Sequence, residues 1–278
     1  MPTVTVNDIE LFYETAGSRY LPPLLLITGL TGYTEDWFTQ VPALQNDFFV
    51  ITFDNRGAGK SSQPEPGYTV ADMADDTAAL LDALNISQAF VFGISMGGMI
   101  ALNLAARHPH KVQKLALGCT TAGGSSWTMP DEKVMAAMTA PSSGDLRQDF
   151  YNSLWFILAP DTMEKDPQLV KQLAEFAANN PQTPTGFMGQ LQAINTHDVT
   201  NALENFTMPS LVLHGDLDVL VPLENGRFLA KAIPSAKFKI YPNTGHLFFV
   251  EQAAAVNEDL RHFFCAPGAA GAKTPSSD

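Results

Sequence analysis

One short stretch, Gly93-Ile94-Ser95-Met96-Gly97-Gly98, constrains the fold more than any other part of this sequence. The apolar run at residues 89–92 is typical of a buried strand, and residues 99–107 have a helical pattern. A serine flanked by glycines at such a junction predicts a turn too tight for side chains at positions 93 and 97. The stretch therefore predicts a strand, a sharp turn and a helix, with the Ser95 hydroxyl at the positive N-terminus of the helix.

The remaining elements predict an α/β fold around that junction. Strands are predicted at residues 4–6, 11–15, 24–27, 48–53, 89–92, 112–117, 210–213 and 237–241. The first two alternate apolar and polar residues and predict an antiparallel hairpin that turns at Asn7-Asp8. The later strands alternate with helical segments, which is typical of a parallel sheet covered by helices. The prediction is a mostly parallel eight-stranded sheet flanked by helices.

This alternation is interrupted between residues 124 and 205. Helices are predicted there at residues 131–139, 145–158, 167–178 and 186–194, and prolines separate them. We therefore expect an α/β core at residues 1–123 and 206–265, with a helical cap at residues 124–205 inserted after the sixth strand. The Gly/Ala/Ser/Lys-rich tail at residues 266–278 is expected to be disordered.

Composition excludes several classes of partner. The net charge of −13 argues against nucleic acid and against an anionic membrane surface, because both would repel the chain. Residues 1–6 have no basic start and no long apolar stretch, so we expect no signal peptide. The sequence has no apolar run of about 20 residues, and the two cysteines show no metal spacing. We expect a cytoplasmic protein, monomeric or homodimeric, without membrane association. No zinc, calcium or nucleotide motif is found, so no metal or cofactor is expected.

A serine hydroxyl needs a histidine to accept its proton and an acid to orient that histidine. In a sheet of this kind the acid and then the histidine follow the serine along the chain. Of the six histidines, His246 alone lies in a loop after a late strand, so it is the predicted base. Asp218 is the predicted acid, with Asp216 as the alternative. His197, between the cap and the core, is expected to be structural.

Four stretches, which follow one another along the chain, together resemble the motifs of one enzyme family. They are residues 54–61 (D-x-R-G-x-G-x-S), the turn at residues 93–98, residues 215–222 (G-x-x-D-x-x-x-P), and Gly245-His246 followed by Glu251. Over about residues 3–265 the chain resembles α/β-hydrolase-fold enzymes, in particular the branch that includes 3-oxoadipate enol-lactonases. Some related enzymes take the acid from the loop after the preceding core strand, but residues 118–123 hold no carboxylate here.

The resemblance implies further roles. Ser95 would be the nucleophile, and Asp54 and Arg56 would brace the loop beside its turn. The oxyanion hole would be formed by the backbone amides of Met96 and Leu30. The family usually has His-Gly at the start of the loop that holds Leu30, whereas this chain has Thr28-Gly29. This departure affects the hydrogen bonds that hold the loop more than the oxyanion hole itself. Thr28 can still offer a hydroxyl for such a hydrogen bond.

The cap is expected to select the substrate, which is a small molecule. Its methionine and aromatic content suits an adaptable apolar pocket, although most of these residues would equally form the core of the cap. We predict substrate contacts from Trp127, Trp155, Phe156 and Leu247. An enol-lactone carries a carboxylate that would need a basic partner, and the cap offers only Lys133, Arg147, Lys165 and Lys171. The sequence thus favours a neutral, fairly apolar ester or lactone, such as an acyl-homoserine lactone or a short acyl ester.

Several alternatives stay open at this point. An enol-lactonase and a cofactor-free haloperoxidase or perhydrolase would use the same three residues. Dehalogenases and epoxide hydrolases of this fold use an aspartate nucleophile, so Ser95 disfavours them. A non-catalytic receptor on the same scaffold would not need a complete Ser-Asp-His set, which this chain retains.

Overall fold

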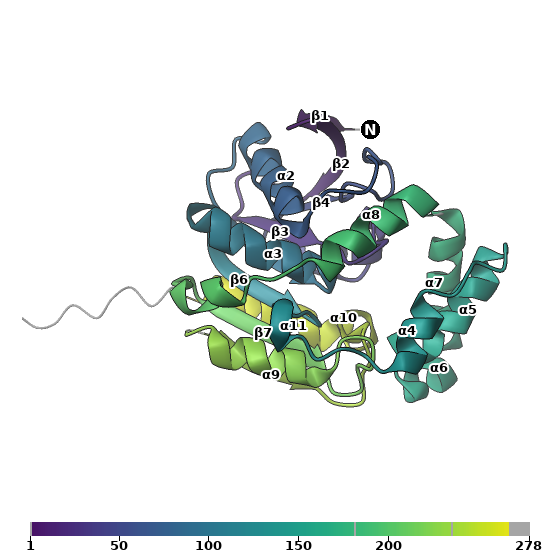
Figure 1. Cartoon of the computed structure of the whole chain (residues 1–278). Helices are drawn as coiled ribbons and strands as arrows, with labels where there is room; N and C mark the ends of the chain where they lie inside the picture. The colour runs from purple at the N-terminus through teal and green to yellow at the C-terminus, as the bar shows by residue number, and fades with distance from the viewer. Residues whose placement is uncertain (1, 181, 235, 267–278) are drawn as a thin grey trace, which may run out of the picture.

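The computed structural model describes residues 2–180, 182–234 and 236–266. In this part of the chain, eight strands form one sheet in the order β1-β2-β4-β3-β5-β6-β7-β8 (Figure 1). The strands are β1 Thr3–Val6, β2 Ile9–Ala16, β3 Pro23–Ile27, β4 Phe49–Phe53, β5 Ala89–Ile94, β6 Val112–Gly118, β7 Ser210–Gly215 and β8 Ala236–Tyr241. The predicted fold class is confirmed.

The pairing of the strands determines where the loops meet. β1 and β2 form an antiparallel hairpin, and β2 pairs antiparallel with β4. The six strands β4, β3, β5, β6, β7 and β8, in the order of the sheet, run parallel to one another. In the register of β3 and β5, Ile27 lies opposite Gly93. Because parallel strands end at the same edge of the sheet, the loop after β3 lies beside the turn that carries Ser95.

Helices cover both faces of the sheet. On one face, α2 (Val70–Ala83), α3 (Met96–Arg107) and α9 (Leu223–Ala232) share an apolar cluster with residues such as Leu25 and Ile27. On the other face, α1 (Gln40–Leu44), α10 (Phe248–Glu251) and α11 (Ala253–Cys265) pack with Leu24 and Leu26. Successive side chains of β3 thus enter opposite clusters, as expected for a strand buried on both faces.

The described residues between β6 and β7 contain helices and no strand of the sheet. The helices are α4 Glu132–Met138, α5 Leu146–Ile157, α6 Pro160–Lys165, α7 Pro167–Asn179 and α8 Pro184–Asn195. The sequence pattern did not predict α6, and it placed the start of α8 two residues late. Thr183 caps α8 by accepting a hydrogen bond from the Gly186 amide, and Pro184 occupies its first turn.

The helices of the cap pack in two different ways. α5 and α7 form a small apolar cluster of their own, made of Leu154, Leu158, Val170 and Leu173. Helix α8 instead docks on the core, because Ala193 and Ile194 belong to the cluster beneath the sheet. Figure 1 shows α4 to α7 at the side of the sheet and α8 beside the core. The division into core and cap stays a prediction, but α8 is structurally part of the core packing.

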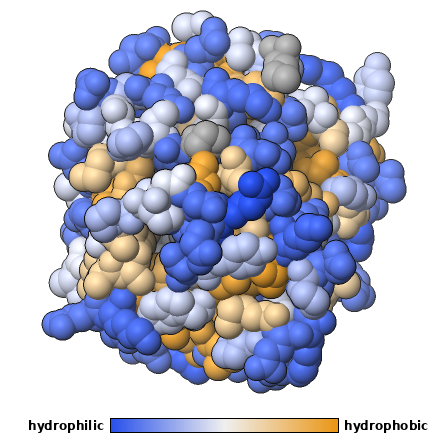
Figure 2. Space-filling view, turned by 90° about the vertical axis from the view of Figure 1, so that its right-hand side faces the viewer, coloured by the Kyte–Doolittle hydropathy of each residue, from blue (hydrophilic) through white to orange (hydrophobic). Residues whose placement is uncertain are grey.

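Two further expectations concern the surface and the C-terminal end. The tail predicted to be disordered lies outside the described residues, except for Ala266, whose carbonyl accepts a hydrogen bond from Lys114. In the described part of the chain, no helix has both the length and the apolar character that a bilayer crossing requires. Figure 2 faces the side that carries α4 to α7, where hydrophobic areas are interspersed among hydrophilic ones.

Candidate active site

Ser95 occupies a strained turn between β5 and α3. Its backbone angles are φ 52° and ψ −124°, a conformation that side chains rarely adopt. A Cβ atom on Gly93 would lie 2.2 Å from the Gly97 carbonyl oxygen, and one on Gly97 would lie 2.1 Å from the Ile27 carbonyl oxygen. Both glycines are therefore required by backbone contacts, as the sequence pattern predicted.

Asp218 and His246 meet at the same edge of the sheet, in the loops after β7 and β8. The Nδ1 atom of His246 lies 2.9 Å from Oδ2 of Asp218. The other carboxylate oxygen accepts the amides of Leu220 and Val221 at 3.0 and 2.8 Å. Asp218 is buried, whereas Asp216 is exposed. The carboxylate that holds the imidazole is therefore that of Asp218.

The pairing changes both pKa values. Burial alone would raise the pKa of Asp218, but the charge of His246 and hydrogen bonds from His214 and His246 lower it to about 2. Burial alone would lower the pKa of His246, but the charge of Asp218 and contacts with Asp218 and Cys119 raise it well above 6.5. The pair therefore favours an ionised carboxylate beside an imidazole that readily takes up a proton.

Two neighbours of this pair were missed from the sequence. His214 Nε2 donates to the Val221 carbonyl at 2.7 Å and lies 3.4 Å from Asp218 Oδ2. Cys119 directly follows β6. Its sulfur, a carboxylate oxygen of Asp218 and a ring nitrogen of His246 all lie within 4.8 Å of one another. The only signal was position, because Cys119 opens the loop in which a carboxylate was sought.

The cluster of thiol, carboxylate and imidazole matches the ligand types that zinc prefers. The imidazole and the carboxylate are, however, already joined by their hydrogen bond. All three side chains are buried. Their arrangement therefore serves the His246–Asp218 pair, and no metal is needed to explain it.

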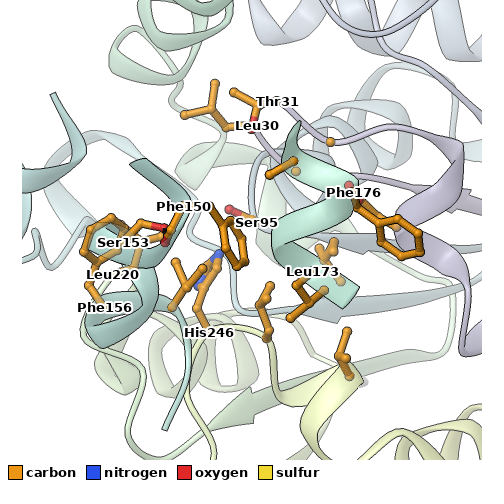
Figure 3. A pocket seen from close by; sticks show the side chains of 18 of the residues that line it. Leu30, Thr31, Ser95, Phe150, Ser153, Phe156, Leu173, Phe176, Leu220 and His246 are labelled. Atoms are coloured by element: carbon orange, nitrogen blue, oxygen red, sulfur yellow. Dashed lines mark hydrogen bonds between the residues drawn. The ribbon is translucent and has the colours of Figure 1, made fainter. Parts of the chain in front are cut away.

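Ser95 and His246 open into one cavity of about 320 Å³. Figure 3 shows Ser95 between Leu30 and Thr31 of the core on one side and His246 on the other. Most of the lining is apolar, and the cap supplies a large part of it, including Met138, Phe150, Ile157, Leu173, Phe176 and Phe187. Among the described residues no hydrogen bond joins Ser95 to His246. In enzymes of this kind the distance between serine and histidine often shortens to hydrogen-bond length only when substrate binds.

The structure divides the predicted substrate contacts. Phe156 and Leu247 line the cavity, but Trp127 and Trp155 do not, so the prediction for the two tryptophans is corrected. Trp155 is 37% exposed and lies beneath the Lys133 ammonium, 4.5 Å from its ring centre. Trp127 packs against the core cluster. Phe150, Ser153 and Ile157 lie on the face of helix α5 that lines the cavity. A residue at position 155 lies on a different face of this helix.

The four cationic side chains of the cap also lie away from the cavity. The described lining contains no lysine or arginine. Arg147 pairs with Glu175 at 2.7 Å, Lys165 pairs with Asp161, and Lys133 covers Trp155. A carboxylate on the substrate would find no basic partner among these residues.

The loop after β3, residues 28–34, is named here the oxyanion loop. Its Gly32 amide donates to the Gly29 carbonyl at 3.1 Å, and Thr31 within this turn has φ 62°. A Cβ on Gly29 would lie 3.1 Å from Ser95 Cβ, so the loop lies directly against the serine. Among the described residues the amides of Leu30 and Met96 have no hydrogen-bond partner. Two free donors therefore flank Ser95.

Residues after β4 brace the oxyanion loop. Asn55 Nδ2 donates to the carbonyl and the hydroxyl of Thr28, at 3.2 and 3.3 Å. Asp54 accepts the amides of Thr34 and Lys60, both at 2.8 Å. The Thr28 hydroxyl thus has a partner where the family usually has histidine, and the contacts of Asp54 agree with a bracing role.

A cap residue holds the same loop from the other side. Gln190 of α8 is fully buried; its Oε1 accepts the Thr31 amide at 3.0 Å and its Nε2 donates to the Arg56 carbonyl at 2.9 Å. The Arg56 side chain itself pairs with Asp76 of α2. Thr31 is held in its left-handed conformation by a residue 159 positions away, which no local sequence signal indicated.

His197 has the surroundings of a structural residue. It does not line the cavity; its Nδ1 accepts from Asn103 at 3.2 Å and its Nε2 donates to the Thr121 carbonyl at 3.3 Å. Burial lowers the pKa of His197 to about 4, which favours the neutral ring. The imidazole ties the end of the cap to the loop after β6.

Residues 22–253 match the family model described as alpha/beta hydrolase fold. The chain belongs to this family, and the resemblance seen in the sequence is confirmed. The enzyme class predicted for it, a carboxylic ester hydrolase, is confirmed at the level of class.

Three similar proteins illustrate the range of the family. A poly(3-hydroxyalkanoate) depolymerase of Ectopseudomonas oleovorans is 35% identical over 89% of this chain and 86% of its own length. The enol-lactonase of Burkholderia xenovorans LB400 has a TM-score of 0.82 and 27% identity, covering 95% of this chain and 99% of its own. Est816, described as an N-acyl homoserine lactone degrading enzyme, has a TM-score of 0.79 and 26% identity, covering 94% of this chain and 100% of its own.

Proposed function

We propose that this chain hydrolyses carboxylic esters or lactones through an acyl-enzyme formed on Ser95. The observation that carries the proposal is the arrangement at one end of the cavity. Ser95 shares the cavity with an imidazole that Asp218 holds at 2.9 Å, and two unpartnered amides lie beside the serine. This combination supplies a nucleophile, a base, an acid that orients the base, and donors for an oxyanion.

The first half of the reaction forms the acyl-enzyme. Ser95 Oγ attacks the substrate carbonyl carbon while His246 takes the hydroxyl proton. The carbonyl oxygen becomes an oxyanion that accepts hydrogen bonds from the amides of Leu30 and Met96. Asp218 stabilises the imidazolium, which then gives its proton to the departing alkoxide. With a lactone, the alcohol stays tethered to the acyl group.

The second half releases the acid. His246 removes a proton from a water molecule, whose oxygen attacks the acyl carbonyl. The second oxyanion accepts hydrogen bonds from the same two amides. The tetrahedral intermediate collapses, Ser95 recovers its proton from His246, and the carboxylic acid leaves the cavity.

We infer that the substrate is neutral and mostly apolar. The cavity is lined by aromatic and aliphatic side chains from the cap and by no described lysine or arginine. This argues against an enol-lactone that carries a carboxylate, even though enol-lactonases are among the structural neighbours. An acyl-homoserine lactone or an acyl ester agrees better with the lining, because the apolar surface can bury an acyl chain.

A hydrolysis panel tests this proposal. It compares 3-oxoadipate enol-lactone, acyl-homoserine lactones with acyl chains of increasing length, and ethyl esters of the same acids, at fixed pH. We expect hydrolysis of the neutral substrates and a kcat/KM that increases with acyl length until the cavity is filled. Preferential hydrolysis of the enol-lactone would overturn the substrate inference and leave the ester-hydrolase mechanism standing.

The pH dependence of hydrolysis follows from the pKa of His246. The base must be neutral to accept the serine proton, and its pKa is raised well above 6.5. We therefore expect kcat/KM for an ethyl ester to increase with pH through a midpoint above 6.5. A rate profile measured between pH 5 and pH 9, corrected for spontaneous hydrolysis, checks this. A midpoint at or below 6.5 would contradict the assigned pairing.

A further inference from the structure

One carboxyl group lines the cavity without a role in the mechanism above. Asp36 belongs to the short helix Thr34–Trp37 that ends the oxyanion loop, and it is the single acidic residue in the described lining. Its Oδ2 accepts the Tyr33 amide at 3.1 Å. Its Oδ1 has no hydrogen-bond partner among the described residues, and it is not among the fully enclosed atoms. This oxygen is free to accept a bond from a molecule in the cavity.

Asp36 also lies close to the reacting centre. A Cβ on Gly32 would lie 2.8 Å from Asp36 Oδ2 and 3.3 Å from the Gly29 amide nitrogen. Gly29 in turn lies against Ser95, since a Cβ on it would be 3.1 Å from Ser95 Cβ. The turn of the oxyanion loop thus lies between the carboxyl group and the nucleophile, and both line the same cavity.

The surroundings leave this carboxyl poorly stabilised by the protein. It forms no ion pair in the described structure, and its neighbours include the carboxylates of Glu35 and Asp54. Burial, with a smaller effect of those charges, raises the pKa of Asp36 to about 7 despite the Tyr33 hydrogen bond. A polar group in an apolar cavity is unfavourable unless it finds a partner, so a ligand that supplies a donor gains binding energy there.

We propose that Asp36 accepts a hydrogen bond from a hydroxyl group on the acyl part of the substrate, a few carbons from the reacting carbonyl, so that the enzyme prefers hydroxyacyl esters. The inference rests on the proposed ester hydrolysis and narrows its substrate class. A neutral hydroxyl suits this site because it can bond to either protonation state of the carboxyl, each of which keeps acceptor oxygens. An ammonium group would require the ionised form. The name of the 35% identical relative refers to a polyester of 3-hydroxy acids, in which the terminal unit carries a free hydroxyl on its acyl part.

The test compares matched substrates in matched variants. Ethyl octanoate and ethyl 3-hydroxyoctanoate differ by one hydroxyl, and the ratio of their kcat/KM values cancels any general loss of activity. We expect wild type to prefer the hydroxyl ester about tenfold or more, Asp36→Leu to bring the ratio to about one, and Asp36→Asn, which keeps an acceptor, to retain most of it. Ser153→Ala, another polar lining residue that already donates to the Phe150 carbonyl, should keep the ratio of wild type.

The outcomes separate the two proposals. A ratio near one in wild type, or an unchanged ratio in Asp36→Leu, overturns the hydroxyl site while ester hydrolysis stands. A preference for a choline ester that both Asp36 variants abolish would identify an ammonium site and also overturn the inference. If neither ethyl ester is hydrolysed and a fluorophosphonate fails to label Ser95, the proposed function itself fails.

Discussion

Replacing Ser95 with alanine should lower kcat on an ethyl ester by about 10⁶-fold, the scale found when a serine nucleophile is removed from such a site. The substitution removes one oxygen atom and leaves the backbone of the turn as it is. Thermal unfolding should therefore stay close to wild type, which separates lost chemistry from lost folding. The assay is steady-state hydrolysis combined with mass spectrometry after fluorophosphonate treatment, in which wild type gains one adduct and the variant gains none.

A matched control is Ser142→Ala. Ser142 lies in an exposed loop of the cap and hydrogen-bonds to Asp149, away from the cavity. It should retain the labelling and the kcat of wild type within a few fold. Full activity in Ser95→Ala would rule out the acyl-enzyme mechanism, and absent labelling in wild type would favour a receptor on this scaffold.

Replacing Asp218 with asparagine should lower kcat by about 10⁴-fold. Asparagine keeps an oxygen for the amides of Leu220 and Val221, but its NH₂ group would face His246 Nδ1. The imidazole would then be held with its proton on the wrong nitrogen. The loss of the carboxylate charge should also shift the midpoint of the pH–rate profile to lower pH, because that charge raises the pKa of His246.

The neighbouring Asp216→Asn variant is a control two residues away. Asp216 is exposed, and its side chain has no hydrogen-bond partner among the described residues, so kcat and the pH profile should change little. Both variants are compared by kcat, pH midpoint and thermal unfolding. A large loss in Asp216→Asn with a small one in Asp218→Asn would reassign the acid and contradict the hydrogen bond seen at His246.

The parts of the fold that the sequence predicted well are those encoded locally. Apolar runs marked the strands, and helical periodicity marked α3, α5 and α7, because burial on both faces or on one face leaves a pattern in consecutive residues. In the cap, helix α6 was missed and the start of helix α8 was placed too late. Helix α6 spans six residues, too few for a clear period, and α8 begins at a proline that looked like a separator.

The candidate site was predictable where it depends on chain order and backbone sterics. Gly93 and Gly97 indicate the turn at Ser95 because only glycine avoids the backbone atoms there. His246 and Asp218 follow the expected strands, and parallel strands bring the loops at their ends together. The tryptophans were misassigned because a residue type does not reveal which face of a helix meets the cavity, and Trp155 points away from it.

The sequence by itself thus determined the α/β fold, the position of the turn at Ser95 and the residues that meet there, since each depends on local pattern or on the order of strands in a parallel sheet. Only the tertiary structure decided that Gln190 holds the oxyanion loop, that Cys119 and His214 lie beside the His246–Asp218 pair, and that Asp36 enters the cavity. The physical reason is that most of these contacts join segments far apart in the chain, and all depend on the direction in which each side chain points once the elements have packed.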